Sequence, residues 1–189
     1  GVMNWIKVPE FSGVLLTVTF LDWVLYYLHR AYHAIPWLWK IHRVHHTDPE
    51  VDVTTGLRFH PVELILTTLV KAGFVYLIGA PIYAVFIYEI LVALFTLYDH
   101  SNIDLPQPFE RYIRAILVTP YMHRVHHSQK SEERDKNYGF IFSVWDDLFK
   151  TLKDPATVNN LSLGLGSFQT TRFLRLKQLL LQPFLYDQG

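Results

Sequence analysis

Three stretches of the chain are rich enough in apolar residues, and long enough, to form helices that cross a lipid bilayer. They are residues 11–28, in which Asp22 is the one charge, and residues 62–78 and 82–97. A helix of eighteen residues rises about 27 Å, close to the roughly 30 Å of a hydrocarbon core. Residues 79–81 are Gly-Ala-Pro, a combination that ends one helix and turns the chain. The pattern predicts one membrane helix followed by a helical hairpin.

The rest of the chain is more polar, and no strand-like alternation of any length emerges from it. We expect a single all-α domain over residues 1–189, with membrane helices at about 11–33 and 62–99. A buried helix of a globular protein gives the same apolar pattern, so that alternative stays open at this point. The predicted non-membrane parts are two helical regions and an amphipathic C-terminal segment, at about 29–60, 100–128 and 168–186.

Basic side chains gather at one end of the predicted hairpin. The turn at 79–81 carries none, whereas the sequence before and after the hairpin holds Arg30, Lys40, Arg43, Arg58, Arg111, Arg114 and Arg124. Membrane proteins retain such residues in the cytoplasm. We therefore expect everything except the N-terminus and the hairpin tip to face the cytoplasm, at a bacterial inner membrane or at the endoplasmic reticulum of a eukaryote.

Composition excludes several classes of function. The 189 residues include 17 basic and 17 acidic side chains and no cysteine. A nucleic-acid partner is not expected, because phosphate backbones bind clustered Lys and Arg. Thiolate metal sites, iron–sulfur clusters and cysteine nucleophiles are excluded as well. Any bound metal must be held by nitrogen and oxygen.

Histidine provides the nitrogen. Eight of the ten histidines form three clusters, at His29 and His33, at His42, His45 and His46, and at His123, His126 and His127. Residues three and four apart are neighbours on a helix, so two imidazoles can hold one ion or flank two adjacent ions. The pentapeptide His-Arg-Val-His-His occurs twice, at 42–46 and 123–127. The surrounding sequence does not repeat, which indicates a repeated ligand module rather than a duplicated domain.

The two other histidines, His60 and His100, lie just before and just after the predicted hairpin. They therefore arrive at the same membrane surface as the clusters, and we predict that all ten converge there. So many imidazoles exceed what one tetrahedral ion can use, which predicts two metals. Nitrogen ligands suit iron, copper and zinc alike. We favour two iron ions, with zinc a possible substitute in purified protein.

The clusters resemble the histidine boxes of the fatty acid hydroxylase superfamily, also called the sterol desaturase family. The similar boxes are HRAYH at 29–33 and HRVHH at 42–46 and 123–127. The resemblance covers about residues 21–152. Further segments look like the bacterial branch similar to alkylglycerol monooxygenases, namely TTGLRFHP at 54–61, HSN at 100–102, NYG at 137–139 and Trp145-Asp146.

This resemblance implies a membrane-bound non-haem di-iron oxidoreductase that uses O₂ to hydroxylate or desaturate a lipid, such as a fatty acyl, sterol or alkylglycerol substrate. It implies that the eight box histidines are metal ligands and that His60 and His100 are additional ones. The sequence shows no flavin, nucleotide or haem motif, so the electrons are expected from a ferredoxin or a cytochrome b5-like donor with its reductase.

Two carboxylates within the predicted membrane helices are further candidates. Asp22 lies seven residues before His29 and Glu89 eleven before His100, spacings that return to nearly the same helical face. Charges in membrane helices are costly and usually functional, so both are expected to orient ligands or line the substrate path, with burial against another polar neighbour as the alternative that stays open. Asp99 and Asp146 are similar candidates. Arg43 and Arg124, inside the repeated modules, are expected mainly on the solvated surface.

Three other functions fit parts of the pattern. A non-catalytic metal-binding or metal-transport protein also needs many histidines, but transporters place their ligands near the bilayer midplane. A b-type cytochrome needs histidines that face each other across spanning helices. A metallohydrolase needs fewer ligands and a carboxylate to activate water, and no HExxH sequence is present.

Overall fold

The structure, a computed structural model, describes residues 1–168 and 170–185. Over these residues the chain is helical, and strand pairing is limited to two isolated bridges, Leu117 with Phe142 and Ser128 with Leu163. The all-α prediction is confirmed. The α-helices are α1 (Val2–Ile6), α2 (Glu10–Ala34), α3 (Pro36–His42), α4 (Pro61–Ile78), α5 (Ile82–Asp99), α6 (Gln107–Arg114), α7 (Pro120–His126), α8 (Ser131–Arg134), α9 (Val144–Leu148) and α10 (Leu176–Leu181). Short 3-10 helices lie at His45–Thr47, Thr55–Leu57, Pro155–Thr157, Gly166–Phe168 and Gln182–Phe184.

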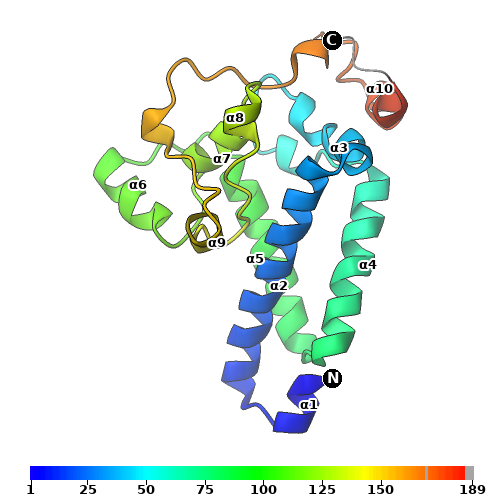
Figure 1. Ribbon diagram of the computed structural model, residues 1–189, viewed down its shortest axis with the longest axis vertical. Helices are drawn as coiled ribbons and strands as arrows, with labels where there is room; N and C mark the ends of the chain where they lie inside the picture. The colour runs from blue at the N-terminus through cyan, green and yellow to red at the C-terminus, as the bar shows by residue number, and fades with distance from the viewer. Residues whose placement is uncertain (169, 186–189) are drawn as a thin grey trace.

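Helices α2, α4 and α5 form a long stalk, and the short elements other than α1 gather as a head at one end of it (Figure 1). By length and composition, all three stalk helices can cross a membrane. Their outward faces carry exposed apolar side chains such as Leu69, Tyr76 and Phe86, a surface suited to lipid rather than water. The structure thus agrees with the predicted membrane helices at about 11–33 and 62–99.

The hairpin turn forms where the sequence predicted it. Gly79 ends α4 with φ 68°, a left-handed conformation that glycine adopts without a steric penalty. Pro81 then precedes the first turn of α5. The turn and α1 both lie at the end of the stalk opposite the head (Figure 1).

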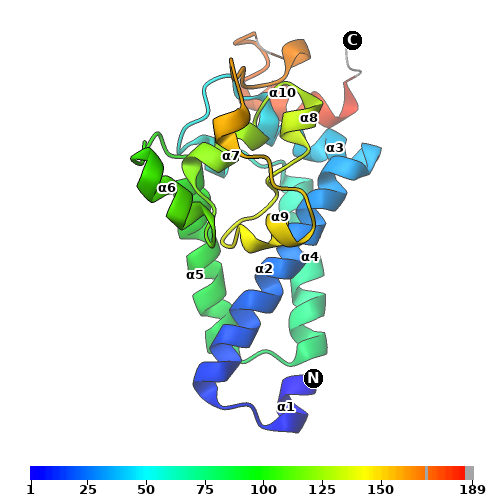
Figure 2. The same cartoon turned by 60° about the vertical axis from the view of Figure 1, so that its left-hand side comes forward.

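Helix α2 is the centre of the bundle. Leu21 and Leu25 on α2 pack with Tyr88 and Val92 on α5, and Ile141 from the head closes the same cluster. One continuous core therefore joins the stalk to the loop that follows α8. The head elements wrap around the upper ends of α2 and α5 (Figure 2).

Two predicted regions are less helical than expected. The segment 29–60 is broken, because α3 ends at His42 and a 3-10 turn follows at His45–Thr47. The segment 100–128 contains only α6 and α7, joined by irregular backbone. Of the predicted amphipathic segment 168–186, the six residues of α10 are α-helical, and residues 169 and 186 lie outside the described residues.

Candidate metal centre

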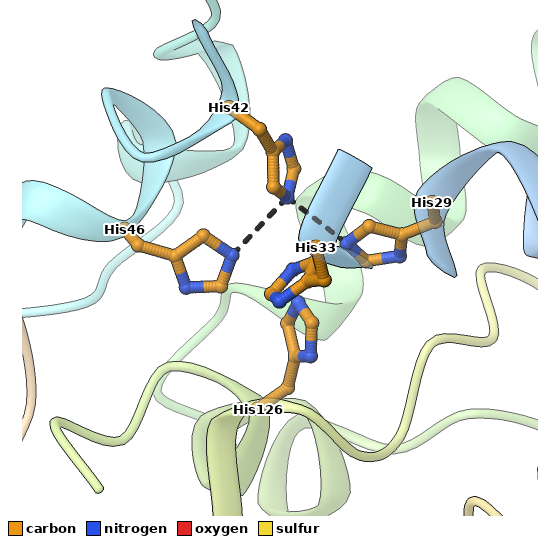
Figure 3. A group of neighbouring side chains, drawn as sticks. All are labelled: His29, His33, His42, His46 and His126. Carbon is orange, nitrogen blue, oxygen red and sulfur yellow. Dashed lines mark hydrogen bonds between the residues drawn. The ribbon is translucent and has the colours of Figure 1, made fainter. Parts of the chain in front are cut away.

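Nine of the ten histidines meet inside the head, in two groups. In each group, ligand-capable nitrogens lie within 4.8 Å of one another. The five-histidine group contains His29, His33, His42, His46 and His126, and Figure 3 shows their rings pointing toward a common centre. The four-histidine group contains His45, His100, His123 and His127. The two groups adjoin, because the rings of His46 and His127 stack with centroids 4.5 Å apart.

The repeated pentapeptide explains this division. The first and last histidines of each copy lie four residues apart and enter the same group, His42 and His46 the five-histidine group, His123 and His127 the four-histidine group. The fourth residue of each copy crosses over, so His45 joins the second group and His126 the first. Each copy thus contributes a pair to one group and a single imidazole to the other.

The spacing between nitrogens fits bound metal ions. Two imidazole nitrogens about 2.1 Å from a shared ion, at angles of about 90–110°, lie about 3.0–3.4 Å apart. His100 Nε2 lies 3.0 Å from Nε2 of His45, 3.0 Å from that of His123 and 3.2 Å from that of His127.

The five-histidine group shows the same spacing. His42 Nε2 lies 3.1 Å from His29 Nε2 and 3.2 Å from His46 Nε2. The Nε2 atoms of His33 and His126 are buried and have no hydrogen-bond partner. Buried polar atoms without partners are costly, and an ion held between these lone pairs would remove that cost. The residues present therefore fit one ion in each group.

The outward-facing ring nitrogens fix how several imidazoles point. Nδ1–H of His29 donates to the Tyr138 carbonyl at 2.9 Å, and Nδ1–H of His126 donates to the Lys136 carbonyl at 2.8 Å. In the other group, His100 Nδ1–H donates to the Thr96 carbonyl at 2.6 Å. A proton on Nδ1 leaves the Nε2 lone pair free to face inward, the usual arrangement of metal-binding histidines.

Two carboxylates also orient histidines by accepting from their Nδ1–H groups, and neither was predicted from the sequence. Glu63 Oε1 lies 2.7 Å from His42 Nδ1, and both side chains are buried. Asp135 Oδ1 lies 3.0 Å from His33 Nδ1. A carboxylate in the first turn of a mainly apolar helix was the available signal for Glu63. Asp135 stands in a charged surface loop and gave no signal.

Burial keeps the imidazoles in the neutral form that binds metals. Eight of the nine residues are buried, and the ninth, His33, has 1% of its side chain exposed. Loss of solvation lowers the pKa of His126 to about 3 and that of His100 to about 4, although the hydrogen bond of each ring to a backbone carbonyl acts in the opposite direction. Burial and the neighbouring imidazoles also hold the pKa of His45, His46, His123 and His127 well below the ordinary value.

Asp22 acts on the centre from a distance. Its carboxylate accepts hydrogen bonds from the backbone N–H of Ile141 at 3.1 Å and of Phe142 at 3.2 Å, and from Trp145 Nε1 at 2.8 Å. The expectation that it faces the histidines therefore does not match the structure. Instead it anchors α2 to the loop that supplies the Tyr138 carbonyl to His29.

Asp146 holds the other end of that loop. It accepts from the backbone N–H of Tyr138 and of Gly139, each at 2.8 Å, and from Thr151 Oγ1 at 2.7 Å. A Cβ at Gly139 would lie 2.7 Å from the Phe142 carbonyl oxygen, so the loop closes this tightly only with glycine. Asp146 therefore contacts the loop that bonds His29 and contacts no histidine itself in the hydrogen bonds of the described residues.

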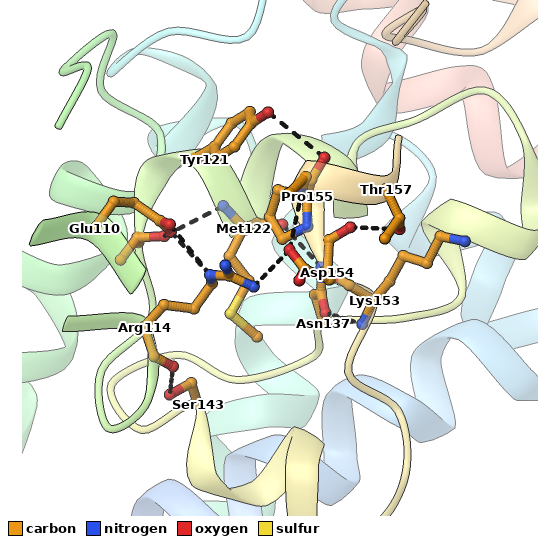
Figure 4. Close-up of polar contacts among 12 residues, drawn as sticks. Glu110, Arg114, Tyr121, Met122, Asn137, Ser143, Lys153, Asp154, Pro155 and Thr157 are labelled. Atoms are coloured by element: carbon orange, nitrogen blue, oxygen red, sulfur yellow. Dashed lines mark hydrogen bonds and ion pairs between the residues drawn. The ribbon is translucent and has the colours of Figure 1, made fainter. Parts of the chain in front are cut away.

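A second network fixes α7, the helix that carries His123 and His126 (Figure 4). Asn137 donates its amide to the Met122 carbonyl at 3.1 Å and to the Lys153 carbonyl at 3.0 Å. At the start of α7, Thr119 Oγ1 donates to Glu110 Oε1 at 2.7 Å, which ties this end to α6. Buried hydrogen bonds at Thr119 and Met122 therefore fix the first turn of this helix.

His60 and Glu89 lie apart from the two groups. His60 Nδ1 accepts from the Val62 N–H at 3.2 Å and so caps α4, and its Nε2 faces the Leu180 carbonyl at 3.3 Å. Both oxygens of Glu89 lie 2.7 Å from Lys71 Nζ, inside the hairpin. The expected convergence of all ten histidines is wrong for His60, and the expected placement of Glu89 on the ligand side is wrong as well.

The remaining candidates fall around the centre. Asp99 is buried next to His100, and its Oδ1 has no hydrogen-bond partner. Arg124 is on the surface as expected and pairs with Asp104 at 3.1 Å. Arg43 differs from the expectation, because its side chain is buried and donates to the carbonyls of Gln182 and Leu185, each at 2.7 Å.

Comparison with known proteins gives a consistent family. The sequence profile of the fatty acid hydroxylase family matches residues 14–151. The chain is 30% identical over 177 residues to an ornithine lipid hydroxylase, OlsE, of Rhizobium tropici, covering 93% of this chain and 51% of that protein. It is 29% identical over 170 residues to an alkylglycerol monooxygenase of Danio rerio, covering 88% and 37%.

A more distant relative is a very-long-chain aldehyde decarbonylase, GL1-8, of Oryza sativa, 26% identical over 162 residues and covering 82% of this chain and 58% of that protein. The chain therefore spans about half the length, or less, of the first two relatives. No solved structure matches the chain significantly.

Proposed function

The chain belongs to the fatty acid hydroxylase family, and on that premise we propose that it is an integral-membrane, non-haem di-iron enzyme that uses O₂ to hydroxylate a C–H bond of a lipid. The observation that carries this proposal is the pair of adjoining histidine groups at one end of three membrane-length helices. The lipid hydroxylase and monooxygenase names of the relatives support the reaction class. Desaturation of the same kind of bond is the second outcome of the proposal.

In this proposal one iron binds in the five-histidine group and one in the four-histidine group. The bound ions would supply the redox chemistry that activates O₂. Hydroxylation consumes one O₂, two electrons and two protons, and it places one oxygen atom in the lipid and the other in water. The electrons would come from a separate one-electron donor, of the ferredoxin or cytochrome b5 kind.

The protein's own residues hold the centre in position and exclude water from it. Glu63, the Tyr138 carbonyl and the Lys136 carbonyl orient His42, His29 and His126 through their Nδ1–H groups. Such supporting contacts preorganise ligands, so that no reorganisation is needed during the reaction. The buried position keeps bulk water away from reactive oxygen species.

Three histidines of the centre lie at the ends of helices that can span a membrane. His29 and His33 lie in the last turns of α2, and His100 directly follows α5. The ligands thus start at the depth where two membrane helices end. Arg30, Arg43 and Arg124 lie at this same end and Lys7 at the other, and because this end carries the excess of basic side chains we propose that the centre faces the cytoplasm.

Lipid analysis under isotopically heavy oxygen gas tests the proposed reaction. We expect a host that expresses the protein to accumulate one lipid heavier by one oxygen atom, and the added atom to come from the gas. Desaturation would instead remove two hydrogens and leave no isotope in the lipid. A His45→Ala variant, which removes one ligand of the four-histidine group, should form neither product. Metal-loaded protein that forms no oxidised lipid with a working electron donor would contradict the proposal and favour a metal-binding or metal-transport protein.

A further inference from the structure

A pocket of about 320 Å³ lies beside the four-histidine group, between the loop 54–60 and α10. Its apolar wall includes Leu176, Leu179 and Leu180 from α10. Among the described residues, its polar side chains are Thr54, Arg58 and His60, and none of the lining side chains is a carboxylate. A mainly apolar cavity of this size with a few polar groups at one end is typical of a site for an amphiphilic small molecule.

One aromatic ring separates this pocket from the metal centre. Phe59 lines the pocket and stacks on His45, with ring centroids 4.5 Å apart and an angle of 9° between the ring planes. Val44, the residue before His45, lines the pocket as well. A molecule in the pocket is therefore one side chain away from a predicted metal ligand.

The polar end of the pocket offers an unused hydrogen-bond donor. Arg58 Nη2 pairs with Asp48 Oδ2 at 2.9 Å. Its other terminal nitrogen, Nη1, is buried and has no hydrogen-bond partner within residues 1–168 and 170–185. Both ring nitrogens of His60 are engaged, so Arg58 is the group with a free donor. A negatively charged oxygen is the partner that forms the strongest hydrogen bond with a guanidinium.

The pocket stands at the level where the membrane begins. Its residue His60 is the N-cap of α4, a helix long and apolar enough to span the bilayer. Apolar side chains on both sides of the pocket point outward, with Leu57 74% and Leu176 73% exposed. Exposed leucines beside the start of a membrane helix suit the lipid interface.

We propose that this pocket binds an anionic membrane lipid, with the headgroup on Arg58 Nη1 and an alkyl chain along the leucines of α10. Phe59 then forms the partition between the lipid and His45. That this lipid is also the substrate rests on the proposed function, whereas the binding of the lipid to the pocket does not.

Photolabelling in vesicles of neutral phosphatidylcholine tests the proposal. The probes are a photoreactive long-chain carboxylate, the matching phosphate monoester and the matching alcohol. We expect both anionic probes to label the segments 54–60 and 176–180, and excess unlabelled anionic amphiphile to suppress that labelling. The relative labelling by carboxylate and phosphate identifies the headgroup.

Four variants locate the contacts. Arg58→Gln should weaken binding of the anionic probes about tenfold, the value of one charge-assisted hydrogen bond, and leave the alcohol unchanged. Arg58→Lys retains the charge and should recover most of the loss. Leu179→Trp fills the pocket and should reduce labelling by all probes. Leu69→Trp, a matched change at a side chain 64% exposed on α4, should have no effect.

Labelling that spreads evenly over α2, α4 and α5, or that survives Leu179→Trp, would overturn the proposal. Equal labelling by alcohol and anions in the unaltered protein would show that Arg58 selects no charge and would also overturn it. Thermal unfolding of each variant in detergent reports whether its fold is intact. Labelling needs no turnover, so this proposal and the proposed enzymatic activity can fail independently.

Discussion

Replacement of Glu63 by glutamine tests whether the five-histidine group binds a metal as a preorganised unit. Glu63 Oε1 lies 2.7 Å from His42 Nδ1, and both side chains are buried. Glutamine has the same shape and can still accept this hydrogen bond, but it lacks the negative charge. The substitution therefore removes the electrostatic support for His42 without creating a cavity.

The expected loss of metal affinity follows from the contact of Glu63 with His42, a predicted metal ligand. Loss of such a supporting group lowers metal affinity about 10-fold to 100-fold, which corresponds to about 1.4–2.7 kcal/mol. We expect Glu63→Gln near the lower limit, because the hydrogen bond survives, and Glu63→Leu near the upper limit. The four-histidine group contains no residue bonded to Glu63, so its affinity should not change.

Anaerobic titration with ferrous iron against a coloured chelator measures both affinities. The unaltered protein should show two binding events, of which only one weakens in Glu63→Gln. Asp135→Asn is a matched change behind His33, where the carboxylate is 44% exposed, and its effect should be smaller because solvent screens the charge. An unchanged titration in Glu63→Leu, or equal weakening of both events in Glu63→Gln, would refute the reasoning.

Two further predictions concern charges within the membrane helices. Asp22→Asn places an amide against backbone N–H donors, so the free energy of unfolding, measured by thermal unfolding in detergent, should fall by about 1.5–3 kcal/mol. The control Asp104→Asn, at a side chain 86% exposed, should leave it unchanged. Substitutions of Lys71 and Glu89, which form an ion pair, should have non-additive effects on stability, because one unpaired charge in a bilayer costs about 2.5–3.5 kcal/mol. In that double-mutant cycle, Lys71→Met alone should destabilise more than Lys71→Met with Glu89→Gln, and additive effects would contradict the pairing.

The elements that the sequence predicted well are those set by local pattern. The apolar stretches became α2, α4 and α5, and the Gly-Ala-Pro turn formed at 79–81, because hydropathy and backbone restrictions act over neighbouring residues. The histidine spacings also predicted which imidazoles share a face. His42 and His46, and likewise His123 and His127, enter a common group as four-residue neighbours should.

The features that the sequence left open depend on distant contacts. The crossing of His45 and of His126 into the opposite groups depends on how distant segments pack together, which a spacing argument on one helix cannot predict. The bond between Glu63 and His42 joins two helices, and Asp22 meets a loop more than a hundred residues later. His60 and Glu89 were misplaced because position near a membrane boundary or on a helix face does not determine which neighbour a side chain meets.

Metal counting in paired alanine variants tests the account's central claim most directly. The double variant His123→Ala with His127→Ala removes half of the four-histidine group and leaves all five members of the other. We predict two ions per chain in the unaltered protein, purified anaerobically with iron, and one in this variant. The mirror variant, His42→Ala with His46→Ala, should retain the ion of the four-histidine group. A single ion in the unaltered protein, or two ions in either double variant, would contradict a two-metal centre divided as the structure divides its histidines.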